Sequence, residues 1–153
     1  MIRVRVQEGD FDVGAELAAL PGEVPGVGAV ASFIGIVRGG DGLRALHLEQ
    51  YPGMTEAALR AIAEEADARW PLTAITIVHR YGRLGVGERI VLVAAASGHR
   101  AAALEAVAFV MDWLKTRAPF WKREEGSWGS RWVEARAEDD AAAGRWAGAS
   151  DIR

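Results

Sequence analysis

"MDWLKTRAPFWKREEGSW", residues 111–128, ends the longest helical pattern in the sequence and begins a strand-like one. Pro119 stops the helix, because proline lacks a backbone N–H and clashes with the preceding turn. The aromatic and charged residues that follow alternate as they do in a β-strand. The segment therefore predicts a helix joined to a strand by a short turn, an arrangement typical of mixed α and β folds.

The same segment contains both lysines of the 153-residue chain, Lys115 and Lys122, whereas the other sixteen basic residues are arginine. The first of them lies at helical spacing after Leu104, Ala108 and Met111, so we expect it to continue an apolar stripe. A lysine in that place can simply lay its stem on apolar surface and keep its ammonium in water. Arginine would do so equally well, but it cannot lose its proton or act as a nucleophilic amine. We therefore interpret both lysines as functional.

The composition excludes several classes of function. A net charge of −3 gives no reason to expect binding to nucleic acid or to a membrane surface. No apolar run approaches the roughly 20 residues that span a bilayer, and the N-terminus lacks the apolar region of a signal peptide, so we expect a cytoplasmic protein. Cysteine is absent, so the chain cannot hold a sulfur intermediate on a cysteine of its own. The three histidines have no metal-binding spacing and no nucleotide-binding loop is present, so we expect no metal and no cofactor.

The rest of the chain reads as strands alternating with two substantial helices, which predicts the α+β class. We expect a short helix after Asp12 as N-cap, and strands at 29–38 and 43–51 that pair as a hairpin across "GGDG". A helix at 55–69 should bury Leu59, Ile62, Ala66 and Trp70. Strands at 72–82 and 89–97 and a helix at 98–117 follow. We expect residues 1–136 to form a single domain and residues 137–153 to be a poorly ordered tail.

Basic residues at the ends of three elements suggest anion binding. His99 and Arg100 lie in the first turn of the helix at 98–117, where free backbone N–H groups favour an anion. Arg38 closes an apolar strand before a glycine turn. Pairing with nearby carboxylates would explain these residues equally well, and we interpret His79 and Arg80 as structural.

These residues leave three functions open. The chain can be an enzyme that uses its two lysines in group transfer. It can be a lyase that forms a Schiff base on Lys115, or a non-enzymatic dimeric module that binds an anionic effector at His99 and Arg100.

Five motifs, "FIGIVR", "LEQYPGMTE", "IVHRYG", "SGHRAAALEAV" and "MDWLKTRAPFWKRE", stand in an order that resembles one known family. They are similar to motifs of the large, catalytic subunit of molybdopterin synthase, the MoaE family. The resemblance covers about residues 28–136. It implies an α/β hammerhead fold with a mostly antiparallel sheet, two main helices and a small β-rich lobe.

The resemblance also implies an activity and its partners. Members of the family form a homodimer that binds two small ubiquitin-like sulfur carriers, giving a heterotetramer. Each carrier ends in a Gly-Gly thiocarboxylate, and its sulfur is transferred to cyclic pyranopterin monophosphate to form the dithiolene of molybdopterin. By motif, the resemblance makes Lys115 and Lys122 the catalytic amines. The substrate contacts that it implies are Ile36 and Val37 by their backbone, Arg38, His99, Arg100, Arg123, Glu124 and Arg136.

One distance bears on these assignments. Arg100 and Lys115 lie fifteen residues apart on one helix, which is roughly 22 Å at 1.5 Å per residue. A pterin phosphate cannot contact both in one chain. We therefore predict a composite site in which His99 and Arg100 come from the second subunit of the dimer. The aromatic residues between Trp113 and Trp132 further predict a hydrophobic groove for the carrier's extended C-terminus.

Overall fold

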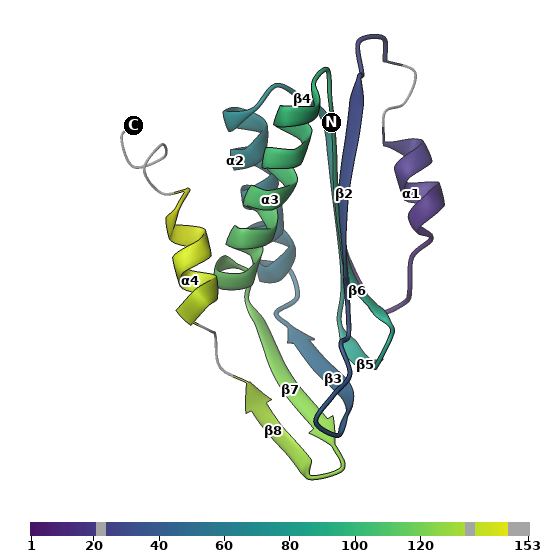
Figure 1. Ribbon diagram of the computed structural model, residues 1–153, viewed down its shortest axis with the longest axis vertical. Coiled ribbons are helices and arrows are strands. Elements are labelled where there is room, and N and C mark those ends of the chain that lie inside the picture. Colours follow the sequence, from purple (N-terminus) through teal and green to yellow (C-terminus); the bar gives the residue numbers. More distant parts are fainter. Residues whose placement is uncertain (21–23, 134–136, 147–153) are drawn as a thin grey trace.

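The computed structural model describes residues 1–20, 24–133 and 137–146 (Figure 1). The strands are β1 (Ile2–Gln7), β2 (Ala29–Ile36), β3 (Leu43–Gln50), β4 (Leu72–Arg80), β5 (Gly82–Gly85), β6 (Arg89–Ser97), β7 (Phe120–Gly126) and β8 (Gly129–Val133). The helices are α1 (Val13–Ala19), α2 (Met54–Arg69), α3 (Arg100–Arg117) and α4 (Ala137–Gly144). No helix within the described ranges is both long and apolar enough to cross a membrane.

The strands form two sheets of four. The first sheet has the order β1-β4-β6-β2, and the second sheet has the order β5-β3-β7-β8. Among the strands in the described part of the chain, only β1 and β4 pair in parallel, and all the other neighbours are antiparallel. This mixture of helices with mostly antiparallel strands confirms the predicted α+β class, and the second sheet is the small β-rich lobe.

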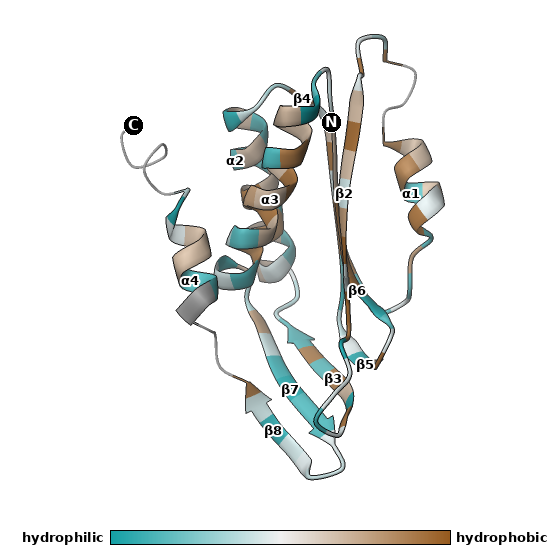
Figure 2. Cartoon of the chain, viewed as in Figure 1, coloured by the Kyte–Doolittle hydropathy of each residue, from teal (hydrophilic) through white to brown (hydrophobic). Residues whose placement is uncertain are grey.

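The first sheet lies between helices. In Figure 1, α2 and α3 cover one of its faces and α1 lies against the other. Its central strands β4 and β6 are apolar along most of their length, as Figure 2 shows, because both of their faces are buried. The main core joins this sheet to α2 and α3 and includes Leu59, Ile75, Ile77, Val93 and Phe109, each fully buried.

The predicted helices are present, with one difference in α3. Asp12 caps α1 as predicted, accepting a hydrogen bond from the Ala15 N–H at 3.0 Å. In α3, Leu104 is 60% exposed instead of belonging to the buried stripe. The buried face runs through Ala103, Val107, Val110 and Leu114. These residues repeat the spacing of the predicted stripe one position earlier, and in an alanine-rich helix the spacing does not distinguish the two faces.

The predicted hairpin of residues 29–38 and 43–51 is wrong. β2 pairs with β6 in the first sheet, whereas β3 pairs with β5 and β7 in the second sheet. The glycine-rich segment between them therefore passes from one sheet to the other. β2 is apolar enough to pair with a buried strand, while β3 alternates and suits a sheet with one exposed face. Pairing with distant strands therefore replaces pairing with the nearest one.

The segment that was predicted to be a tail begins with a helix. Residues 137–144 form α4, Ala143 is buried, and the Trp146 ring lies 5.6 Å from Trp70 and 5.7 Å from Phe109. The Trp146 indole N–H also donates to Asp112 at 2.6 Å. The composition of this segment gave no indication of its attachment, which depends on the Trp146 ring, on the bond to Asp112 and on a hydrogen bond that the Trp146 carbonyl accepts from Arg69 at 2.8 Å. Residues 147–153 lie outside the described residues.

Candidate functional site

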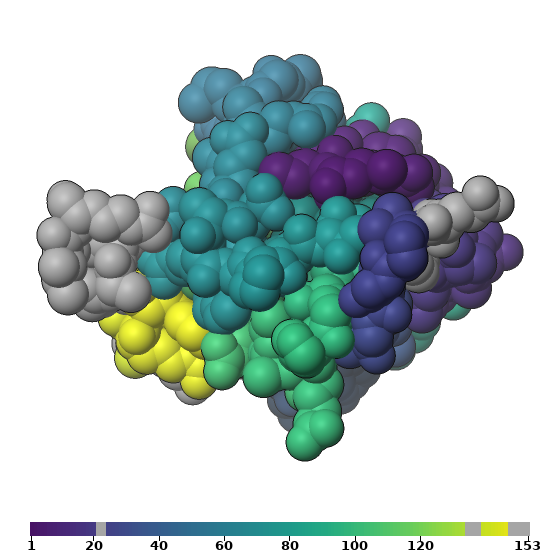
Figure 3. Space-filling view, turned by 90° about the horizontal axis from the view of Figure 1, so that it is seen from above, coloured from purple at the N-terminus to yellow at the C-terminus, as the bar shows by residue number. Residues whose placement is uncertain are grey.

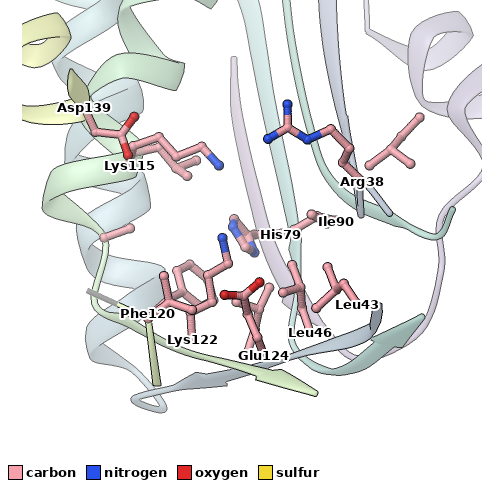
Figure 4. Close-up of a pocket in the computed structure, with 15 residues that line it drawn as sticks. Arg38, Leu43, Leu46, His79, Ile90, Lys115, Phe120, Lys122, Glu124 and Asp139 are labelled. Atoms are coloured by element: carbon pink, nitrogen blue, oxygen red, sulfur yellow. The ribbon is translucent and has the colours of Figure 1, made fainter. Parts of the chain in front are cut away.

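A cavity of about 430 Å³ lies where α3 meets the second sheet (Figure 4). Its apolar lining comes from Leu43, Leu46 and Leu48 of β3, Ile90, Leu114, Ala118 and Phe120, together with Ile36 and Val133. Its polar lining consists of Arg38, His79, Lys115, Lys122, Glu124 and Asp139. Three of the predicted basic site residues, Arg38, Lys115 and Lys122, thus meet in one cavity, on side chains from both lobes of the fold.

The two lysines reach the cavity from different elements. Lys115 lies in the last turn of α3, and Lys122 is the third residue of β7. Ala118 and Pro119 join α3 to β7, which continues away from the end of the helix (Figure 1), and both side chains point into the same space (Figure 4). The structure therefore brings together the two amines that the sequence singled out.

Strand alternation divides the segment after Lys122. Lys122 and Glu124 line the cavity, whereas Arg123 pairs in register with His47 and lies on the opposite face of the second sheet. On that outer face His47 contacts Glu125 at 2.7 Å, and Arg83 donates to Glu125 at 3.0 Å. These hydrogen bonds lower the pKa of Glu125, that from His47 most strongly. Arg123 is therefore separated from the other predicted site residues.

The three substrate contacts that were predicted at the end of β2 and just after it do not all line the cavity. Ile36 and Arg38 line the cavity, and the Arg38 guanidinium points into it from the side opposite Lys115 (Figure 4). Val37 is buried in the apolar cluster beneath the second sheet. Its N–H donates to the Glu88 carbonyl and its carbonyl accepts from the Gly87 N–H, both at 2.9 Å. The N–H of Val37 is thus already used within the chain.

His99 and Arg100 lie at the far end of α3 from Lys115, and both are exposed. Figure 3 looks onto that end of the molecule and shows the start of α3 at the surface, between α4 and β2. Neither residue lines the cavity of its own chain. The structure therefore keeps the separation on which the prediction of a composite site depends. Arg136 lies outside the described residues.

Two polar residues that line the cavity, His79 and Asp139, were not predicted as site residues. His79 was interpreted as structural, and its ring is indeed buried, stacked on Phe120 with a centroid distance of 3.9 Å. Its Nδ1 lies 2.8 Å from the Arg80 carbonyl, so Nδ1 bears the hydrogen and donates it. Burial lowers the pKa of His79 to about 4; the hydrogen bond to the Arg80 carbonyl raises it by less than burial lowers it, and the positive charge of Lys115 lowers it by a smaller amount still.

Asp139 of α4 is the second residue that the sequence did not indicate, because it falls in the segment that was predicted to be a tail. Its carboxylate lies beside Lys115 in Figure 4. On the other side of the cavity, the Glu124 carboxylate accepts from Arg131 at 3.3 Å. Two carboxylates thus line a cavity whose other charged groups are amines and a guanidinium.

This arrangement has a defined chemical capacity. The amines and the guanidinium can neutralise a small anion, and ammonium groups can also donate protons. The apolar part of the lining lowers the local dielectric constant, which strengthens these electrostatic interactions. Fold and cavity together define an α+β protein whose cavity combines two lysines and an arginine that can neutralise an anionic small molecule.

Comparison with known proteins narrows that class. The model of the family described as MoaE protein matches residues 6–117. A molybdopterin synthase catalytic subunit of Pseudomonas aeruginosa is 56% identical over 146 residues, covering 94% of this chain and 97% of that protein. One of Ralstonia nicotianae is 53% identical over 149 residues, covering 95% and 85%. A solved structure of a Burkholderia ambifaria molybdopterin biosynthesis MoaE protein superposes with a TM-score of 0.83 at 52% identity, covering 96% of this chain and 99% of that one.

The chain belongs to the MoaE family. The resemblance predicted from the five sequence motifs is therefore confirmed.

Proposed function

We propose that this chain is the enzyme subunit that transfers sulfur from the thiocarboxylate of a small ubiquitin-like carrier to cyclic pyranopterin monophosphate, forming the dithiolene of molybdopterin. The observation that supports this most directly is the meeting of Lys115, Lys122 and Arg38 in one cavity of a MoaE family member. The chain has no cysteine, so the sulfur must come from another molecule. We extend the proposal to the cytoplasmic location expected from the sequence.

The cations of the cavity suit this reaction. A thiocarboxylate is already a good nucleophile and needs no base to activate it. The harder task is to hold two anions together, because two like charges about 4 Å apart repel by roughly 4 kcal/mol at an effective dielectric constant of 20. Lys115 would contact the carrier's terminal carbonyl as cation and proton donor. Lys122 would orient and protonate the pterin intermediate, with Glu124 beside it.

The substrate phosphate would be held by Arg38 and by two residues of a second subunit. His99 and Arg100 do not line the cavity of their own chain, yet the motif that contains them is one of those that the family shares. In a two-fold dimer the start of one α3 can approach the cavity of the partner. We propose that His99 and Arg100 complete the site in this way, and that two carriers bind the dimer to form a heterotetramer.

The carrier's extended C-terminus would enter along the apolar lining of the cavity. Of the aromatic residues that predicted a groove, only Phe120 lines this cavity in the described part of the chain. Trp113 is buried in the core, whereas Trp121 and Trp132 are exposed and 6.0 Å apart. The leucines of β3 would therefore contact the Gly-Gly tail. They form part of the apolar lining of the cavity, against which a segment without side chains can lie.

A reconstituted assay tests the function. The purified chain is mixed with a carrier that bears a C-terminal thiocarboxylate and with the pterin substrate, and dithiolene formation is followed. We expect the unaltered chain to turn over. Lys115→Ala should abolish turnover while carrier binding persists, and Lys115→Arg should also be inactive. Turnover by Lys115→Arg close to that of the unaltered enzyme would show that charge alone suffices at this position. Effector binding without sulfur transfer would instead favour the non-enzymatic module.

A further inference from the structure

The relative placement of the two lysines depends on the turn between α3 and β7, which we name the elbow (residues 118–120). Lys115 lies three residues before the elbow and Lys122 two residues after it. α3 belongs to the helical layer on the first sheet, while β7 belongs to the second sheet. Any change in the elbow therefore changes the separation and the orientation of the two amines.

Local hydrogen bonds satisfy most of the elbow. The Ala118 N–H donates to the Leu114 carbonyl at 3.3 Å and ends α3. The Phe120 N–H donates to the Ala118 carbonyl at 2.9 Å, which closes a three-residue turn around Pro119. Pro119 has no N–H, so its carbonyl is the remaining backbone group of the turn. That carbonyl accepts a hydrogen bond from the Thr55 hydroxyl at 3.0 Å.

Thr55 is placed to make this bond by the start of α2. It is fully buried, and its hydroxyl accepts from the Tyr51 N–H at 3.0 Å while it donates to Pro119. Its own N–H donates to the Tyr51 carbonyl at 3.0 Å. Both roles of the hydroxyl are therefore occupied, and the side chain has one fixed orientation. A buried hydroxyl with both partners satisfied specifies geometry more strongly than an apolar contact would.

The two segments that Thr55 joins have the same role in the fold. Residues 51–53 connect β3 of the second sheet to α2, and the elbow connects α3 back to β7. β3 and β7 pair where the two connections begin, with Gln50 opposite Phe120. Thr55 thus links the two connecting segments between the lobes by hydrogen bonds, close in sequence to Lys115 and Lys122.

We propose that Thr55 is a positioning residue, which keeps Lys115 and Lys122 at the separation that sulfur transfer needs. This inference rests on the proposed function of the two lysines. Its chemical basis is that catalytic groups must be held within fractions of an ångström, and a misplacement of about 1 Å can lower a rate by about 10². Thr55 itself does not line the cavity.

The test compares Thr55→Val with two reference variants in the full assembly with carrier and substrate. Thr55→Ser keeps the hydroxyl. Thr76→Val makes the same substitution at a threonine that is 2% exposed on β4 and does not contact the elbow through any hydrogen bond in the described chain. We expect Thr55→Val to lower kcat about tenfold or more with KM for the pterin changed less than twofold. Thr55→Ser should recover most of kcat, and Thr76→Val should leave it unchanged.

A second measurement reports the distance between the two lysines independently of enzyme activity. Because the chain has only two lysines, a short amine-reactive cross-linker of defined length can report their separation, and digestion followed by mass spectrometry identifies the linked peptides. We expect an intramolecular link between Lys115 and Lys122 whose yield falls in Thr55→Val and is unchanged in Thr76→Val. If Thr55→Val does not fold, Thr55→Cys, which offers a weak donor of similar size, takes its place.

The outcomes separate the two proposals. Equal kcat values and equal cross-link yields for the variants at 55 and 76 would overturn the role of Thr55. Absence of sulfur transfer in the unaltered enzyme would overturn the proposed function, while the cross-linking comparison would still decide whether Thr55 sets the distance between the amines.

Discussion

Acidification should destabilise the protein through His79. Burial holds the pKa of this imidazole at about 4 in the folded chain, against 6.5 for an exposed histidine. Between these values the unfolded chain binds a proton that the folded chain does not. The stabilising effect of the neutral imidazole is therefore complete above pH 6.5 and is lost as the pH falls toward 4.

The magnitude follows from the two pKa values. Each pH unit inside the window changes the free energy of unfolding by up to about 1.4 kcal/mol, and the transition at its upper edge is gradual. Integration from pH 7 to pH 5 gives a loss of about 2 kcal/mol from this one group. The charged groups that face it across the cavity, Lys115, Lys122, Arg38, Glu124 and Asp139, remain the same in any variant of His79.

The assay is urea unfolding at pH 7, 6 and 5, at one protein concentration because the protein is expected to be oligomeric. The reference is His79→Asn, whose amide can replace Nδ1 as donor to the Arg80 carbonyl but does not titrate in this range. The variant will be less stable at every pH, since it loses the stacking on Phe120. Its stability should, however, fall by about 2 kcal/mol less than that of the unaltered chain between pH 7 and pH 5. Parallel curves for the two proteins would refute the reasoning.

The remaining predictions concern the two faces of β7, the composite site and a buried arginine. Lys122→Ala should lower kcat by about 10² or more, whereas Arg123→Ala, on the opposite face, should change it less than threefold; similar losses would place both residues at the site. Mixing Arg100→Ala and Lys115→Ala proteins, each inactive alone, should restore activity once subunits exchange, because one site of each heterodimer is intact. Exchange without activity would contradict the shared site. Arg69 lies within 4.5 Å and 5.0 Å of the Phe109 and Trp113 ring centres and bonds Glu65 and the Trp146 carbonyl. Arg69→Ala should therefore cost about 3–5 kcal/mol in urea unfolding, against less than about 1 kcal/mol for Arg60→Ala in an exposed pair. Equal losses would show that the buried contacts contribute little.

The elements of the fold were predictable where the pattern was local. Pro119, the Asp12 cap and the apolar runs of β4 and β6 each specify a structure within a few residues. The partner of β2 was not predictable, because the alternation of β3 and the glycine turn favoured a hairpin equally well. That choice is made by burial against β6, which lies more than fifty residues further along the chain.

The candidate site shows the same division. Lys115 and Lys122 were found because lysine is rare in this chain, and Arg38 because it closes a strand. His79 resembled any other histidine at the end of a strand, and only its position beneath Phe120 brings it to the cavity. Asp139 had no signal, since the attachment of α4 depends on the Trp146 ring. Arg123 was grouped with its neighbours by motif, and strand alternation separates it from them.

The attachment of Trp146 matters for anyone who shortens this protein. A chain cut after residue 133 would retain every predicted site residue except Arg136. From the sequence alone, the alanine-rich segment after this point gives no reason to keep it. Yet the cut would uncover the Phe109 ring, leave the Asp112 carboxylate without the Trp146 indole and the Arg69 guanidinium without its carbonyl acceptor. All three lie on or against α3, the helix that ends in Lys115. Weak activity of such a shortened protein would therefore reflect the lost packing of α3. Affinity tags or fusions are best placed beyond residue 146.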